Sequence, residues 1–174
     1  MTPLRNAHPD LPWEERLLSF HALSRRRALW RQEGKTVVAT NGCFDLLHLG
    51  HLVYLERASQ LGDLLVVGLN SDASVRAIKG PSRPINPEMD RACALAALRS
   101  VDAVCVFHEK DALAFLEIAS PDVYVKGGDY TLESINQEER GLIESSGGSI
   151  QIVTGVPDRS TSSLLRRIDS SPHR

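Results

Sequence analysis

Five short apolar runs, separated by helix-like stretches, constrain the fold of this chain most strongly. Each run is rich in β-branched residues and almost continuously apolar, which is typical of strands buried on both faces. Strands that alternate with helices are joined by right-handed crossovers, so the pattern predicts a doubly wound parallel sheet. We therefore expect a single α/β domain with strands at residues 37–40, 64–70, 103–107, 123–126 and 149–154.

Helical patterns fill the stretches between these runs. Before the first strand, a partial apolar stripe predicts one helix over 13–32, with Gly34 as its stop. We expect three parts: an N-terminal helical segment 1–34, a main domain 35–168 and a disordered tail 169–174. The helices predicted within the main domain are 51–60, 73–78, 88–99, 112–119, 137–146 and 162–168.

Composition excludes several classes of protein. The 174 residues carry a net charge of -2, so no global basic field favours nucleic acid as a partner. Three cysteines without a CxxC pair indicate free thiols in a reducing compartment. No apolar run approaches the roughly 20 residues that span a bilayer, and the N-terminus lacks the apolar core of a signal peptide. We expect a cytoplasmic protein that binds neither nucleic acid nor membrane.

The segment TNGCFDLLHLGH, residues 40–51, runs out of the first predicted strand and into a helix expected to begin near Gly50. His48 and His51 stand one helical turn apart at this helix start, on the side where doubly wound sheets bind their ligands. A helix N-terminus offers free amides and partial positive charge, and each imidazole can donate to a phosphoryl oxygen. The segment predicts a polyphosphate site, and hence an enzyme that acts on a nucleotide.

Other kinds of site fit this segment less well. Cys43, His48 and His51 could ligate zinc, but no fourth ligand or open catalytic geometry is evident nearby in the sequence. The segment is not G-x-G-x-x-G, and the chain has no GxxxxGK[ST] motif. Neither a dinucleotide-binding loop nor a P-loop is therefore expected.

Three later segments lie where ligands of such a sheet collect. KGPSRP (79–84) places two cations in a loop stiffened by proline, VKGGDY (125–130) has glycines that allow close backbone approach, and DRSTSS (158–163) sets hydroxyls beside Arg159. Each also has an ordinary alternative: solvated surface charges, a Gly-Gly turn, and helix N-caps.

Taken together, these segments resemble the HxGH nucleotidyltransferases, a family with a Rossmann-like sheet. GCFDLLHLGH resembles the family signature, and KGPSRP with KGGDY resembles the branch that makes ADP-heptose. The resemblance covers about residues 35–168 and implies that a sugar phosphate attacks the α-phosphorus of ATP, releasing pyrophosphate. It implies the acceptor D-glycero-D-manno-heptose 1-phosphate and a stand-alone form without a kinase domain. A cytidylyltransferase acting on glycerol 3-phosphate or another small phosphate remains the alternative.

The resemblance also assigns roles to residues. It implies Mg²⁺ bound with ATP, although no protein ligand of the metal can be named, and relatives suggest a homodimer. Asp45 could instead cap the following helix. The expected catalytic residues are His48, His51 and Lys79; the sugar-phosphate residues are Asp45, Arg83 and Arg91; the nucleotide residues are Asn41, Gly42, Cys43, Phe44, Gly50, Lys126, Gly127, Asp129, Arg159, Thr161, Ser162 and Ser163.

Overall fold

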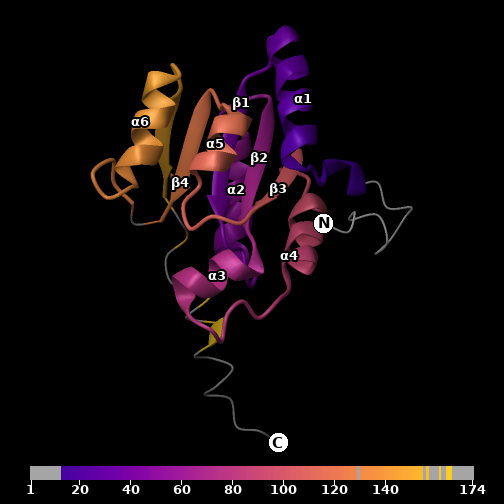
Figure 1. Cartoon of the computed structure of the whole chain (residues 1–174), viewed down its shortest axis with the longest axis vertical. Helices are drawn as coiled ribbons and strands as arrows, with labels where there is room; N and C mark the ends of the chain where they lie inside the picture. The colour runs from indigo at the N-terminus through magenta and orange to yellow at the C-terminus, as the bar shows by residue number, and fades with distance from the viewer. Residues whose placement is uncertain (1–12, 129, 155, 157–160, 162–163, 166–174) are drawn as a thin grey trace, which may run out of the picture.

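A five-stranded, all-parallel sheet forms the centre of the molecule (Figure 1). The computed structural model describes residues 13–128, 130–154, 156, 161, 164 and 165. The strand order is β3-β2-β1-β4-β5, which confirms the predicted doubly wound sheet. The strands are β1 (Val37–Gly42), β2 (Leu64–Asn70), β3 (Ala103–Phe107), β4 (Val123–Gly127) and β5 (Ser149–Val153).

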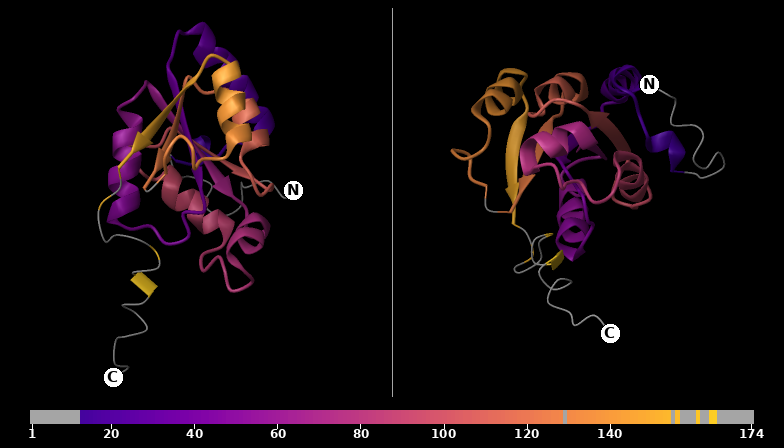
Figure 2. Two further views of the ribbon diagram at one scale, coloured as in Figure 1. Left: turned by 90° about the vertical axis from the view of Figure 1, so that its left-hand side faces the viewer. Right: turned by 60° about the horizontal axis from the view of Figure 1, so that its bottom comes forward.

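Helices cover both faces of the sheet (Figure 2). Helices α1, α5 and α6 pack on one face, around Leu23, Phe115 and Ile143, and α2 and α4 pack on the other, around Leu55 and Leu95. Helix α3 lies beyond the carboxyl ends of the strands, at the bottom of Figure 1. The helices are α1 (Phe20–Gln32), α2 (Leu49–Ser59), α3 (Asp72–Lys79), α4 (Glu88–Ala96), α5 (Leu113–Ala119) and α6 (Gln137–Ser145).

The single helix predicted over residues 13–32 is wrong. A short 3₁₀ turn, Glu14–Arg16, precedes an extended link in which Leu17 forms a parallel bridge with Val104 at the edge of the sheet. Helix α1 begins only after Ser19, whose side chain accepts a hydrogen bond from the amide of Ala22. Residues 17–19 are not helical despite their helix propensity, because pairing with β3 satisfies backbone groups at the otherwise unpaired edge of that strand.

The bounds of the helices α2 to α6 also differ from the prediction, by one to three residues. Helix α4 ends at Ala96 and not at residue 99, and the guanidinium of Arg16 donates to the carbonyls of Ala96, Leu98 and Val101 beyond that end. Helix α2 begins at Leu49, slightly earlier than expected. Of the predicted helix 162–168, residues 164 and 165 are helical, as is residue 161, and the remainder lies outside the described residues.

The strand order reverses between β1 and β4, and these two strands separate toward their carboxyl ends. They pair at only two positions, Val38 with Val123 and Ala39 with Tyr124, whereas β1 and β2 pair at six. The hydroxyl of Tyr54 from α2 fills the gap, donating to the carbonyl of Val125. A crevice at such a reversal is where ligands of doubly wound sheets bind.

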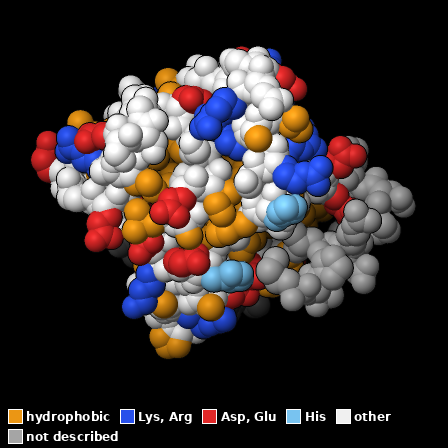
Figure 3. Space-filling model, turned by 45° about the horizontal axis from the view of Figure 1, so that its top comes forward, with side chains coloured by type: hydrophobic (Ala, Val, Ile, Leu, Met, Phe, Trp, Pro, Cys, Tyr) orange, Lys and Arg blue, Asp and Glu red, His pale blue; other side chains and the backbone are white. Residues whose placement is uncertain are grey.

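The surface shown in Figure 3 carries acidic and basic side chains side by side, with apolar side chains between them. Neither sign of charge forms a continuous field on that face. Among the helices of the described residues, none combines the length and the apolar composition that crossing a bilayer would need.

Candidate functional site

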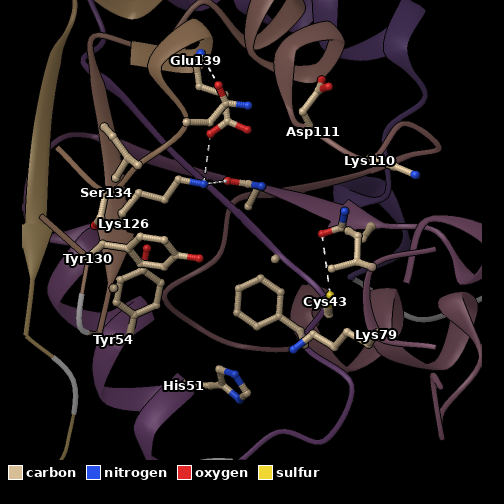
Figure 4. Close-up of a pocket in the computed structure, with 18 residues that line it drawn as sticks. Cys43, His51, Tyr54, Lys79, Lys110, Asp111, Lys126, Tyr130, Ser134 and Glu139 are labelled. Carbon is tan, nitrogen blue, oxygen red and sulfur yellow. Dashed lines mark hydrogen bonds and ion pairs between the residues drawn. The ribbon is translucent and has the colours of Figure 1, made fainter. Parts of the chain in front are cut away.

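A cavity of about 670 Å³ opens at the carboxyl ends of β1 and β4 (Figure 4). Its wall contains residues from β1, α2, α3, β4, α6 and the loops that follow β3 and β4. Eight residues predicted for the site line it: Asn41, Gly42, Cys43, Phe44, His51, Lys79, Lys126 and Gly127. The crevice predicted from the strand pattern therefore collects eight of the fourteen predicted site residues that the structure describes.

The two histidines stack on each other at the start of α2. Their ring centroids are 3.9 Å apart with an interplanar angle of 27°. His48 is the N-cap of the helix, and its carbonyl accepts from the amide of His51 at 2.9 Å. Within the described part of the chain, the buried Nδ1 atom of each ring has no hydrogen-bond partner. The rings are thus held mainly by packing on each other and, for His51, on the ring of Phe44.

The environment of this pair favours neutral imidazoles. Burial, and then the neighbouring His48, lower the pKa of His51 to about 4. Burial also lowers the pKa of His48. At neutral pH, His51 is therefore an uncharged donor, and the favourable field for an anion comes from the N-terminus of α2 and the nearby lysines.

A tight turn brings the strand to the histidines. Phe44 adopts a left-handed backbone conformation with φ of 43°, which is uncommon for a residue other than glycine. Its buried ring lies 5.2 Å from the ring of His51. A Cβ atom on Gly42 would stand 3.0 Å from the Phe44 ring, so glycine at that position lets the ring fold back over the strand.

Asp45 has a different role from the two predicted for it. The residue is only 3% exposed, and its carboxylate accepts from Arg83 and from the amides of Ile85 and Asn86. Burial opposes ionisation, but these hydrogen bonds together hold the pKa of Asp45 below its usual value. The helix cap is His48, so the capping alternative is wrong. The carboxylate of Asp45 already accepts hydrogen bonds from the 80–86 loop, so the prediction that it contacts a sugar phosphate does not fit the structure.

Arg91 is likewise committed to the protein. Its fully buried guanidinium donates to the carbonyls of Cys43, Asn70 and Asn86, and pairs with Asp72 at 2.8 Å. These contacts join the ends of β1 and β2 to the start of α4. The prediction that Arg91 contacts a sugar phosphate does not fit these contacts, and Arg91 instead holds the loops that surround the cavity.

Three lysines line the cavity, and two of them, Lys79 and Lys126, come from segments predicted for the site. Lys79, the last residue of α3, is exposed and lines the cavity on the same side as His51 in Figure 4. Lys126, at the end of β4, has a side chain that is only 13% exposed. Its ammonium donates to Asn41 at 2.8 Å and pairs with Glu139 at 3.1 Å.

Sequence reasoning missed the opposite wall of the cavity. Glu139 from α6, the loop residues Tyr130 and Ser134, and Lys110 and Asp111 after β3 all line it. Glu139 falls inside a polar helical stretch, QEER, and an acidic residue in such a stretch is usually solvated. Only the packing of α6 against the sheet buries this carboxylate, so no local signal could have identified it.

The remaining predictions have mixed outcomes. His48, Gly50 and Arg83 do not line the cavity, although His48 stacks on a ring that does. Asp129, Arg159, Ser162 and Ser163 lie outside the described residues, and the role of Thr161 stays a prediction. Among the described side chains, no group of three or more His, Cys, Asp or Glu residues could hold a metal ion, so the zinc alternative at Cys43 is not supported.

Known proteins resemble this chain over most of its length. It is 48% identical over 162 residues to the bifunctional protein HldE of Syntrophotalea carbinolica, a match that covers 93% of this chain and 33% of the relative. The bifunctional protein HldE of Geotalea uraniireducens is 47% identical, with 94% and 32% covered. The chain thus spans about a third of the length of these curated relatives.

Solved structures and a family model agree with this relationship. The lipopolysaccharide core biosynthesis protein of Thermoplasma volcanium superposes with a TM-score of 0.59 at 31% identity, covering 71% of this chain and 98% of that protein. The pantoate-beta-alanine ligase of Francisella tularensis superposes with a TM-score of 0.58 at 15% identity, and the match covers 88% of this chain and 73% of the ligase. At that identity the match shows a shared fold alone. A family model described as cytidylyltransferase-like matches residues 39–167. The chain belongs to the cytidylyltransferase-like family.

Proposed function

We propose that this protein is an adenylyltransferase that transfers AMP from ATP to D-glycero-D-manno-heptose 1-phosphate, giving ADP-heptose and pyrophosphate. The observation that carries the proposal is the stacked pair His48 and His51 at the N-terminus of α2, beside a cavity that also holds Lys79 and Lys126. Amide donors, imidazole donors and ammonium groups around one crevice are what a triphosphate requires.

The reaction needs positioning and charge stabilisation more than acid–base chemistry. A phosphate oxygen of the acceptor is already ionised at neutral pH, so it can attack the α-phosphorus without a general base. The P–O bond to the pyrophosphate then breaks, and negative charge on the transferred group and leaving group must be stabilised. We assign that stabilisation to His48, His51 and Lys79, with the amides that open α2.

Two further assignments complete the nucleotide site. We propose that Mg²⁺ arrives with the triphosphate, since this ion is usually held by substrate phosphates together with one or two carboxylates. The hydroxyl run Thr161 to Ser163, with Arg159, is proposed to hold the outer phosphates at the start of the last helix. Arg159→Ala should then raise the KM for ATP more than it lowers kcat.

The heptose acceptor has support from two sources. KGPSRP and KGGDY resemble the ADP-heptose branch of the family, and the structure brings Lys79 and Lys126 of these two segments to one cavity. The relatives at 47–48% identity are bifunctional HldE proteins, and a solved relative is named for lipopolysaccharide core biosynthesis. A sugar phosphate is therefore the acceptor class that we favour.

A substrate matrix tests the proposal. The purified chain is incubated with Mg²⁺, each nucleoside triphosphate and either heptose 1-phosphate or glycerol 3-phosphate, while pyrophosphate release is followed. We expect ATP with heptose 1-phosphate to give the highest kcat/KM. Faster turnover with CTP and glycerol 3-phosphate would replace this proposal with the cytidylyltransferase alternative, with which the family description is equally compatible.

A further inference from the structure

Glu139 and Lys126 form an ion pair inside the cavity, on the side opposite His51 and Lys79 (Figure 4). Glu139 is 3% exposed. Two of its three partners belong to the framework: the amide of Ala112 donates to one carboxylate oxygen at 2.9 Å, and the phenol of Tyr124 lies 2.7 Å from the other. The carboxylate is therefore fixed by α5 and β4 before it meets the lysine.

Lys126 depends on this carboxylate for its position. An ammonium has three protons to donate, and the described residues accept two of them, at Asn41 and Glu139. Among the described residues the third proton has no acceptor, so it can be donated to a ligand in the cavity. The rings of Tyr124 and Tyr130 lie 4.9 Å and 5.8 Å from the Nζ atom, so the ammonium is enclosed on several sides.

Such enclosure is unfavourable for a charged lysine. Burial lowers the pKa of Lys126, and the negative charge of Glu139 raises it again. The other titratable side chains that line the cavity are His51 and Tyr54 from α2, Lys79 from α3, and Cys43, Lys110, Asp111 and Tyr130 from loops. Among the ion pairs of the described residues, only that with Glu139 includes Lys126.

We propose that Glu139 is a positioning residue, which holds the ammonium of Lys126 charged and directed at the phosphate groups of the substrates. It touches no reacting atom and acts through the lysine. The proposal deepens the proposed function and rests on it for the identity of the phosphates. The ion pair itself can be measured without any substrate.

The test compares Glu139→Gln with Glu138→Gln, a neighbouring and exposed glutamate of the same helix. The Nζ titration of Lys126 is followed by NMR in protein labelled with [¹³C]lysine. Glu139→Gln should lower the pKa of Lys126 by at least about one pH unit, because an opposite charge in contact shifts a buried group by that much. Glu138→Gln should leave it unchanged. An unchanged titration in Glu139→Gln overturns the proposal, whether or not the chain turns over heptose 1-phosphate.

Kinetics supply the second readout. In Glu139→Gln the alkaline limb of kcat/KM should move to lower pH by the same interval as the lysine titration. Lys126→Arg does not titrate below about pH 12, so in this variant the contribution of Lys126 should disappear and the alkaline limb should move to higher pH; the variant remains informative if Glu139→Gln fails to fold. An alkaline limb that stays at its wild-type pH in Lys126→Arg would show that the limb belongs to another group, such as Lys79, and would refute the role. Absence of turnover in the wild-type chain would instead refute the proposed function and leave the titration standing.

Discussion

His48 and His51 stack with their ring centroids 3.9 Å apart, and the carbonyl of His48 accepts from the amide of His51. The first turn of α2 thereby sets both imidazoles in fixed positions relative to the helix amides. A pair fixed in this way can stabilise a developing charge without rearranging during the reaction.

Removing either imidazole should therefore lower turnover far more than binding. We expect His48→Ala and His51→Ala each to reduce kcat by at least about 100-fold, the effect of losing one transition-state donor. The Kd for ATP should change much less. Steady-state kinetics with pyrophosphate detection and calorimetric binding measure the two effects, and His21→Ala, an exposed histidine on α1, is the control. Turnover close to wild type in either variant would remove the imidazoles from the mechanism.

Stability should fall on mild acidification because the imidazole of His51 is largely shielded from water. Its pKa is about 4 in the folded chain and 6.5 as a free side chain, so the unfolded chain binds more protons between these values. The free energy of unfolding should therefore be highest above about pH 6.5 and should fall toward pH 4. The titration of His51 accounts for as much as about 3 kcal/mol of this fall. Urea denaturation at a series of pH values measures the decline. His51→Gln should flatten that slope, and an equal slope in the variant would contradict the assignment.

The Asp45 carboxylate should matter more for stability than an exposed ion pair of the same charge. Asp45→Ala removes a buried carboxylate that accepts from the amides of Ile85 and Asn86 and from Arg83, and losing these part-buried hydrogen bonds should cost about 1–3 kcal/mol in total. Glu56→Gln breaks the pair with Arg99, which is 90% exposed, and should cost less than about 1 kcal/mol. Chemical denaturation compares the two variants. Equal losses would mean that Asp45 does not hold the 80–86 loop.

Glycine is required at position 127 by the packing of Tyr54. A Cβ atom there would stand 2.6 Å from the Tyr54 ring, whose hydroxyl occupies the gap between β1 and β4. Gly127→Ala should destabilise the chain by about 1–3 kcal/mol through overpacking. Gly141→Ala in α6 meets nothing within 4 Å and should stabilise it by about 0.5–1 kcal/mol, since alanine favours helix. Thermal melting distinguishes the opposite signs, and a neutral Gly127→Ala would show that the ring can move aside.

Local sequence patterns were enough to predict the strands and the helix start that carries the histidines. Leu64–Asn70 and Ala103–Phe107 were predicted residue for residue, because strands buried on both faces leave a continuous apolar run that is visible locally. The crevice followed from topology, since carboxyl ends of parallel strands share one edge. The turn that joins β1 to α2 is also local, and His48 and His51 were identified from it.

Which charged groups face the cavity and which hold the framework depends on long-range packing, which no local pattern shows. Asp45, Arg91 and Glu139 are all charged residues of a kind that is usually solvated, and the sequence around them does not show what buries them. Each is buried by an element distant in sequence: the 80–86 loop closes on Asp45, the ends of β1 and β2 surround Arg91, and α5 and β4 enclose Glu139. Burial depends on long-range packing, and burial decides whether a charge binds the protein itself or remains available to a ligand.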